Sequence, residues 1–287
     1  MIVPVTLATR TWDEGRDGPA GPLALLIHGV TASSRTWWRV APELVRRGFR
    51  VLAVDLRGHG ASPSVSEGLV LGDLSADVLE TLRANGLSGK DGWPSIGVER
   101  PLDRAAVDLV VGHSLGALVA LDLLAKDPGL ARRLVLEEPA GPTGVDWEAM
   151  AEGIQSDGRR ARGEPEAMRR ELQVSNPAWA PAEVDRRLAD MADCDAEGIA
   201  AAFRRTTAFD LAGLAGAVRI PTLLMVGLEH LGSALVGPDR VALVEALDGR
   251  GVFEVLDEGH NLHREAFPRF MDVLGGWLKV TAGIREG

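Results

Sequence analysis

The chain has little cysteine and no segment typical of an export signal. It holds one cysteine, Cys194, so no disulfide can form within the chain and an oxidising compartment is not required. The N-terminal segment MIVPVTLATRTWDEG lacks a basic region followed by an apolar core, so we expect no signal peptide. These absences predict a cytoplasmic protein.

Long apolar runs and excess positive charge are also missing. The most apolar window, residues 109–125, contains His113, Ser114 and Asp122 and therefore predicts strand, turn and helix rather than a membrane span. With 31 Lys and Arg against 41 Asp and Glu, the net charge is −10. Such a charge disfavours binding to nucleic acid or to anionic membranes. We expect neither as a partner, and instead a small-molecule substrate and a monomer or homodimer.

Apolar runs and helical periodicity alternate along most of the 287 residues. A length of this size fits one large α/β domain with an inserted lobe, or two small domains. Alternating strands and helices imply a mostly parallel, doubly wound sheet with helices on both faces. Strands are predicted at residues 3–12, 23–27, 50–56, 109–111, 133–138, 221–227 and 251–256, and helices at 36–47, 69–85, 115–126, 238–247 and 265–279. Residues 86–104, rich in Gly, Pro and charge, are predicted to be an irregular surface excursion.

The composition changes after residue 140. Residues 144–217 contain several helical patterns and no convincing buried strand, which predicts a helical cap. We therefore divide the chain into a core, residues 1–140 and 218–287, and a cap, residues 141–217.

The motif GHSLG, centred on Ser114, lies between a predicted strand and a predicted helix. In that context a G-x-S-x-G motif presents a nucleophilic serine on a strained turn, while Gly112 and Gly116 let strand and helix approach closely. The helix N-terminus then offers the backbone N–H of Leu115 to a developing oxyanion. A second donor is predicted at Val30, whose N–H follows His28-Gly29 at the end of another buried strand.

A serine nucleophile needs a base, and His260 is the histidine that follows the last predicted strand. The carboxyl ends of parallel strands meet at one edge of a sheet, so His260 and Ser114 are expected at the same edge. We expect His263 to begin a helix, and His59 and His113 to be packed, hydrogen-bonded residues beside the site. No metal is expected, because His260 and His263 alone lack further ligands.

Five segments, LLIHGVTASSRTWW, VLAVDLRGHGAS, VVGHSLG, PTLLMVG and LDEGHNLH, together resemble the α/β-hydrolase superfamily, in the group with a cap after the sixth strand. The resemblance covers essentially the whole chain, although the cap matches only in type. It implies a catalytic triad without cofactor, and it is far less specific for substrate than for fold. Epoxide hydrolases and haloalkane dehalogenases, which are otherwise similar, use Asp at the position of Ser114.

The acid of the triad departs from the usual pattern. Relatives usually place an Asp three residues after the glycine that ends the seventh strand, but here that position, counted from Gly227, is His230, preceded by Glu229. The other known location is the end of the sixth strand, where this chain has Glu137 and Glu138 before a proline. Two acids closing a buried strand are costly unless one is used, and successive strand residues face opposite ways. We favour Glu138, with Glu229 and then Glu137 as alternatives.

The function predicted from these residues is that of a serine esterase, a hydrolase that cleaves an ester, thioester or lactone of a small, largely apolar substrate through an acyl-enzyme on Ser114. Carbon–carbon bond hydrolysis, cofactor-free perhydrolysis and a non-catalytic ligand receptor are the alternatives. Trp37, Trp147 and Trp179 are candidates for the apolar lining of a pocket between sheet edge and cap, although plain packing is the slightly favoured explanation for the two cap tryptophans.

Overall fold

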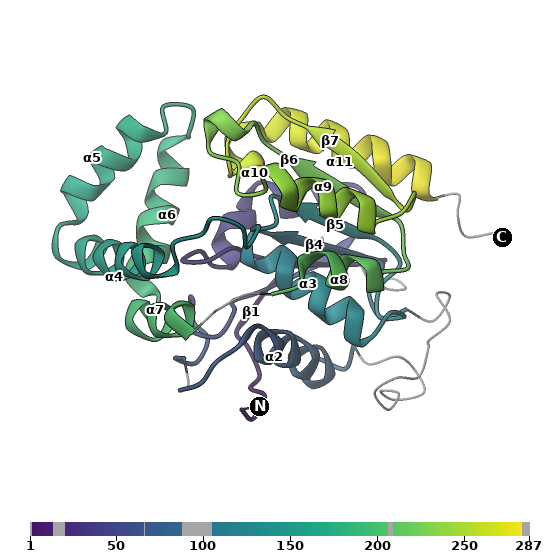
Figure 1. The fold of residues 1–287 in the computed structure, drawn as a ribbon, viewed down its shortest axis with the longest axis horizontal. Helices are drawn as coiled ribbons and strands as arrows, with labels where there is room; N and C mark the ends of the chain where they lie inside the picture. Colours follow the sequence, from purple (N-terminus) through teal and green to yellow (C-terminus); the bar gives the residue numbers. More distant parts are fainter. Residues whose placement is uncertain (1, 14–20, 66, 88–104, 206–208, 283–287) are drawn as a thin grey trace.

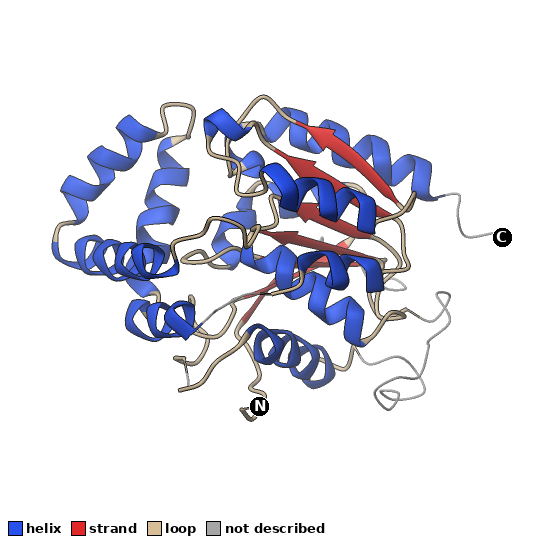
Figure 2. Ribbon diagram, viewed as in Figure 1, coloured by secondary structure: helices blue, strands red, loops and turns tan. Residues whose placement is uncertain are grey.

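A computed structural model describes residues 2–13, 21–65, 67–87, 105–205 and 209–282. Its centre is a seven-stranded sheet of order β1-β3-β2-β4-β5-β6-β7 (Figures 1 and 2). β1 pairs with β3 antiparallel and every other pairing is parallel, as the sequence predicts. The strands are β1 (Thr9–Trp12), β2 (Leu23–Ile27), β3 (Arg50–Val54), β4 (Leu109–His113), β5 (Leu134–Glu137), β6 (Thr222–Val226) and β7 (Gly251–Val255).

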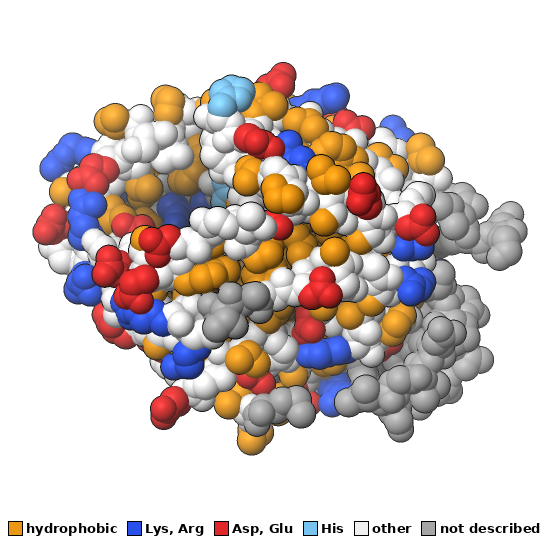
Figure 3. All heavy atoms as spheres, in the orientation of Figure 1, with side chains coloured by type: hydrophobic (Ala, Val, Ile, Leu, Met, Phe, Trp, Pro, Cys, Tyr) orange, Lys and Arg blue, Asp and Glu red, His pale blue; other side chains and the backbone are white. Residues whose placement is uncertain are grey.

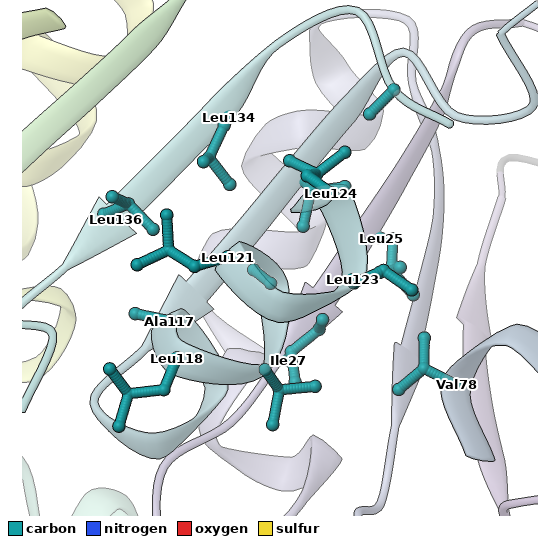
Figure 4. Close-up of a cluster of buried hydrophobic side chains, with 14 of the residues drawn as sticks. Leu25, Ile27, Val78, Ala117, Leu118, Leu121, Leu123, Leu124, Leu134 and Leu136 are labelled. Atoms are coloured by element: carbon teal, nitrogen blue, oxygen red, sulfur yellow. The ribbon is translucent and has the colours of Figure 1, made fainter. Parts of the chain in front are cut away.

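Helices cover both faces of this sheet because its central strands are apolar on both sides. On β2, Leu25 and Ile27 belong to one buried cluster while Ala24 and Leu26 belong to the other, as strand alternation requires. The first cluster, part of which Figure 4 shows, is covered by α2 (Leu71–Ala84), α3 (Leu115–Lys126), α8 (Leu211–Ala217) and α9 (Gly237–Ala246). The second is covered by the 3₁₀ helix η1 (Ser34–Trp38), α1 (Val40–Arg46), α10 (Leu262–Glu265) and α11 (Phe267–Ala282).

One predicted helix, residues 36–47, is interrupted and forms η1 and α1, whereas nearly all of the predicted closing helix, residues 265–279, lies in α11, which a break separates from the short α10. Pro42 and Pro268 lie just after the two breaks. Because proline has no N–H to bond the preceding turn, a helix cannot run through either position without loss.

The first strand is shorter than predicted. Its N-terminal part runs past α2 instead of pairing with a strand, and three of its N–H groups donate to side chains of that helix. Val5 donates to Asp77 at 2.8 Å and Leu7 donates to Thr81 at 2.9 Å, with a longer contact from Ile2. These side-chain acceptors replace a strand partner. Most of the predicted surface excursion, residues 88–104, lies outside the described residues.

A helical insert follows β5. It consists of α4 (Trp147–Gly163), α5 (Pro165–Ser175), α6 (Pro181–Asp193) and α7 (Ala196–Arg205), and it forms the cap at the left of Figure 1. The cap boundary expected at residue 217 includes α8, yet α8 packs against α3 and α9 of the core. We therefore propose that the cap ends before α8.

Polar contacts join α6 of the cap to η1 of the core. The Ser33 hydroxyl donates to Asp190 at 2.5 Å, and Arg35 pairs with the same carboxylate at 3.3 Å. The Trp38 indole donates to Glu183 at 2.5 Å. Hydrogen bonds between largely buried groups demand a defined geometry, so they fix the cap against the core. In the described part of the chain, no helix combines the length and apolar character needed to cross a bilayer.

Candidate active site

Ser114 occupies the sharp turn between β4 and α3, with φ 52° and ψ −117°. Few residues other than glycine adopt a positive φ, and here the neighbouring glycines make the turn possible. A Cβ at Gly116 would collide with the carbonyl oxygens of Ile27 and His28 on β2 and just beyond it. The predicted strained turn is therefore present, and the Ser114 N–H still donates to the carbonyl of Glu137 at 2.9 Å.

Glu138 follows β5 directly and also has a positive φ, 47°. Its carboxylate Oε2 lies 3.1 Å from Nδ1 of His260, the contact favoured from the sequence. The side chain of Glu138 is fully buried, whereas 28% of the His260 side chain is exposed. The acid is thus shielded from water while the imidazole remains accessible.

Three further donors hold the Glu138 carboxylate, and the sequence analysis did not find them. Oε1 accepts hydrogen bonds from the Gly227 N–H at 2.6 Å and the Ser233 hydroxyl at 2.7 Å, and Oε2 accepts one from the Ala234 N–H at 2.6 Å. Arg240 in turn donates to the Ser233 hydroxyl at 3.1 Å. Since the carboxylate is an acceptor at both oxygens, Nδ1 of His260 carries the proton and Nε2 keeps its lone pair.

Glu229, the alternative acid, lies in a 3₁₀ turn, η3 (Glu229–Leu231), with 54% of its side chain exposed. Its carboxylate accepts a hydrogen bond from the Gly237 N–H at 3.1 Å. Glu229 thus closes a surface loop, while Glu138 contacts the imidazole.

Glu137, the third alternative, pairs with a different histidine. Its Oε1 lies 2.8 Å from Nδ1 of His263, and Nε2 of His263 lies 2.6 Å from the Thr36 hydroxyl. Arg264 donates to that hydroxyl at 2.7 Å, so the hydroxyl donates to Nε2 and Nδ1–H donates to Glu137. Burial raises the pKa of Glu137 and lowers the pKa of His263 well below its usual value.

His113 completes this buried group. Its Nε2 lies 3.0 Å from the carbonyl oxygen of His260, so it holds the loop that carries the imidazole. His113, Glu137 and His263 are close enough together to suggest a metal site. Both ring nitrogens of His263 are already engaged, however, and Nε2 of His113 donates to a carbonyl. The three residues therefore suit a hydrogen-bond network better than an ion.

The loop after β2 lies directly against the nucleophile. A Cβ at Gly29 would lie 3.1 Å from Cβ of Ser114 and 2.8 Å from Nδ1 of His113, so only glycine allows this approach. Val30 and Leu115, the predicted oxyanion donors, both line the same pocket as Ser114. Thr31 has φ 52°, and its carbonyl and hydroxyl accept hydrogen bonds from Arg187 of the cap.

The pocket lies between the strand ends and the cap and encloses about 850 Å³, including the part open to solvent. Hydrophobic side chains gather where the cap meets the core in Figure 3. The polar side chains in the lining are Arg57, His59 and Ser114. The remaining lining is apolar apart from the backbone of Gly141, and comprises Val30, Leu69, Val70, Leu71, Leu74, Leu115, Leu118, Ala140, Val145, Trp147, Met150, Ile199, Ala202, Phe203 and Phe209.

Of the three tryptophans expected in the lining, Trp147 is there. Trp37 is fully buried in the core cluster on the opposite face of the sheet, with its ring centroid 4.9 Å from that of His263. Trp179 is covered by the guanidinium of Arg264, 5.0 Å from its ring centroid. The expectation is corrected for both, because each indole packs against the core instead of facing the cavity.

The fold is that of α/β hydrolases, and the chain belongs to the alpha/beta hydrolase family, whose model matches residues 24–273. It is 34% identical over 169 residues to "Lipase LipV" of Mycobacterium tuberculosis, covering 58% of this chain and 52% of that protein. The chain thus spans about half the length of that curated relative. It is 28% identical to "Putative carbamate hydrolase RutD" of Variovorax paradoxus, covering 74% of this chain and 76% of that one.

Solved structures share the fold at lower identity. A thermophilic esterase from Thermogutta terrifontis has a TM-score of 0.70 at 22% identity, covering 96% of this chain and 93% of its own. An enol-lactonase from Burkholderia xenovorans LB400 has a TM-score of 0.71 at 22% identity, covering 95% and 96%.

Proposed function

We propose that this protein is a serine hydrolase that cleaves an ester, thioester or lactone of a small, largely apolar substrate through an acyl-enzyme on Ser114. The observation that carries the proposal is the buried Glu138 carboxylate 3.1 Å from Nδ1 of His260, at the strand edge where Ser114 lines an apolar pocket. Nucleophile, base and orienting acid are the three groups that such a mechanism requires.

In the first half of the reaction, Nε2 of His260 accepts the hydroxyl proton of Ser114 as Oγ attacks the substrate carbonyl carbon. The backbone N–H groups of Val30 and Leu115 stabilise the negative oxygen of the tetrahedral intermediate. When the bond to the leaving group breaks, the imidazolium returns the proton to the leaving oxygen or sulfur. Glu138 remains ionised throughout and stabilises the imidazolium.

In the second half, water replaces the alcohol or thiol. His260 takes a proton from this water as its oxygen attacks the acyl carbon, and then protonates Oγ of Ser114 as the acid product leaves. No redox change occurs, so the residues described are sufficient for the chemistry.

The names of the relatives support this reaction class. One is a lipase, and solved structures of the same fold include an esterase and an enol-lactonase. The apolar lining of the pocket favours a substrate with a hydrocarbon part, because burying apolar surface supplies the binding energy.

The test combines ester turnover with covalent labelling. We expect wild-type protein to hydrolyse p-nitrophenyl esters and to be labelled by a fluorophosphonate. Ser114→Ala should lose labelling and more than about 1,000-fold of turnover, because only the oxyanion donors and binding remain. Ser175→Ala, at an exposed position on α5, is the matched control and should retain both. Near wild-type turnover in Ser114→Ala would refute the proposal, and wild-type protein without labelling would indicate a non-catalytic receptor.

A further inference from the structure

We propose that Arg187 of the cap is a positioning residue, which holds the turn that carries the Val30 N–H and so lets the cap control how well the oxyanion is stabilised. This inference rests on the proposed function, in which the N–H groups of Val30 and Leu115 stabilise the tetrahedral intermediate. Arg187 belongs to α6 and reaches the turn through Thr31.

The turn spans residues 29–32, shortly after β2. The Ala32 N–H donates to the carbonyl of Gly29 at 3.3 Å and closes it. Val30 and Thr31 are its two inner residues, and Thr31 has φ 52°. A positive φ at the second inner position is characteristic of turns that favour glycine there. For a β-branched residue this conformation is strained, so it persists only where surrounding groups hold it.

The direction of the Val30 N–H depends on the carbonyl of Gly29, because the two groups belong to one planar peptide and point opposite ways. That carbonyl accepts Nδ1–H of His28 at 2.7 Å in addition to the Ala32 N–H. The first side of the turn is therefore held from within the core.

Arg187 holds the other side of the turn. Its Nη1 donates to the carbonyl of Thr31, and its Nη2 donates to the Thr31 hydroxyl at 2.9 Å. The peptide that follows Thr31 is thus fixed at both ends, its carbonyl by Arg187 and its N–H, that of Ala32, by the Gly29 carbonyl. Without Arg187 this peptide can rotate and the strained φ can relax. The Val30 N–H would then lose its direction.

The guanidinium of Arg187 suits this role because it is charged, forked and withdrawn from water. Burial lowers its pKa to about 10, so it remains charged near neutral pH. Its planar fork can reach two acceptors at once, and a hydrogen bond from a charged donor is stronger than one between neutral groups. Within the described residues its hydrogen bonds go to Thr31. Loss of that contact would leave a desolvated charge without an acceptor, so the contact is strongly favoured.

The position of Arg187 is itself fixed by its neighbours on α6. Glu183 and Asp190 lie on the same face of the helix by their spacing of four and three residues from Arg187. Glu183 accepts the Trp38 indole N–H, and Asp190 accepts the Ser33 hydroxyl. α6 is the cap helix that lies beside the core in Figure 1, where it contacts η1. The guanidinium is therefore in place before a substrate arrives, as preorganised stabilisation of an oxyanion requires.

The first experiment compares Arg187→Met with Arg186→Met in the full-length protein. Arg186 is the matched control, because it is the adjacent residue on α6 and its guanidinium lies 4.2 Å from the ring centroid of Trp38. With a p-nitrophenyl ester, we expect Arg187→Met to lower kcat by about 100-fold, the effect of displacing an oxyanion donor. Arg186→Met should stay within about threefold of wild type. Arg187→Lys, which keeps the charge but not the fork, should lie between them.

A second experiment separates positioning from a general role in binding. An alkyl trifluoromethyl ketone accepts Oγ of Ser114 at its carbonyl carbon, the hydroxyl proton passes to His260, and the carbonyl oxygen becomes an oxyanion. We expect Arg187→Met to raise the inhibition constant of this ketone by about 100-fold, in parallel with its effect on kcat/KM. The Kd of the intact ester, measured by calorimetry in Ser114→Ala with and without Arg187→Met, should change less than about threefold. A kcat for Arg187→Met within about threefold of wild type, or equal losses of ketone and ester affinity, would overturn the inference.

Thr31→Val covers the case in which Arg187→Met does not fold. This change removes the hydroxyl that accepts from Nη2 and keeps both the carbonyl and the shape of the side chain. We expect kcat to fall by about three- to tenfold, and to fall no further when the change is added to Arg187→Met, because the partner is already gone. An unchanged kcat in Thr31→Val, or losses that add in the double variant, would contradict the proposed contact.

An amide resonance distinguishes failure of this inference from failure of the proposed function. In ¹⁵N-valine-labelled protein, the Val30 amide resonance should move in Arg187→Met and stay in place in Arg186→Met, whether or not the protein is active. An unmoved resonance in a protein that hydrolyses esters would reject the role of Arg187 and leave the serine hydrolase intact. A resonance that moves, in a protein whose wild type cleaves no ester, would do the reverse.

Discussion

Two adjacent glutamates at the end of β5 serve two different histidines. Glu137 belongs to the strand and pairs with His263 in the buried core, while Glu138 pairs with the partly exposed His260. Consecutive strand residues face opposite ways, and the positive φ of Glu138 turns the chain out of the sheet after that point. Glu137 therefore stabilises the core beneath the site, and Glu138 is part of the site itself.

The assignment of Glu138 as the orienting acid makes a direct prediction. Glu138→Gln should reduce kcat by about 10³- to 10⁴-fold, because an amide facing Nδ1 favours the wrong imidazole tautomer. Glu229→Gln, at an exposed loop position, is the control and should change kcat less than about threefold. Ester hydrolysis assays on both variants, with circular dichroism to verify folding, decide the point. If Glu229→Gln reduced kcat more than Glu138→Gln, the orienting acid would be Glu229, which follows β6.

The sequence predicted much of this site at the level of single residues. Glu138 is favoured over Glu229 and Glu137 because it precedes the proline where similar hydrolases carry the sixth-strand acid, and its carboxylate does contact His260. The hydrogen bonds from Gly227, Ser233 and Ala234 were not predictable, since they depend on how the loop after β6 folds back. Trp37 was misplaced because a helical pattern does not reveal on which face of the sheet a side chain lies.

At the scale of elements, apolar runs located the strands within one or two residues, except for β1. The structure shortened the first strand because α2 side chains take its N–H groups, a contact between segments about 70 residues apart. The helical segments break just before Pro42 and Pro268, and hydrophobic periodicity alone does not predict these breaks. The extent of the cap is harder to predict, because helical periodicity does not show which helices α8 packs against, and in the structure it packs against α3 and α9.

The close contact between α3 and β2 predicts a strong effect of one methyl group. Gly116→Ala should destabilise the protein by more than about 2 kcal/mol, because its Cβ would meet rigid backbone carbonyls and force the two elements apart. Gly276→Ala on α11 is the matched control, since nothing lies within 4 Å of a Cβ there. That change should stabilise the protein by up to about 1 kcal/mol through helix propensity. Urea unfolding of both variants measures the difference, and equal midpoints would contradict it.

At the scale of the whole molecule, the core contains several buried imidazoles that stay neutral. Burial lowers the pKa of His28 to about 4 and that of His59 to about 3. In the unfolded chain each would titrate with the ordinary histidine pKa of 6.5. Between these values the unfolded state binds protons that the folded state does not, so each imidazole contributes stability above pH 6.5 that is lost as the pH falls.

Replacement of one of these imidazoles separates its contribution to the pH dependence of stability from the contributions of the other groups that titrate in acid. Between pH 6.5 and pH 3, the free energy of unfolding of wild-type protein should fall more steeply than that of His59→Phe, by about 1.4 kcal/mol per pH unit. Urea unfolding at half-unit pH intervals gives both curves. Parallel curves would show that His59 is protonated equally in the folded and unfolded states.

The place of Trp147 in the pocket has an optical consequence. The chain has seven tryptophans and no tyrosine, so its intrinsic fluorescence comes from indole alone. Trp147 lines the cavity, whereas Trp37 lies in the opposite core cluster and Trp179 lies under Arg264. A ligand that enters the cavity changes the surroundings of the Trp147 indole and leaves those two emitters as they were. The protein thus carries its own reporter of occupancy, readable by emission intensity without any attached dye.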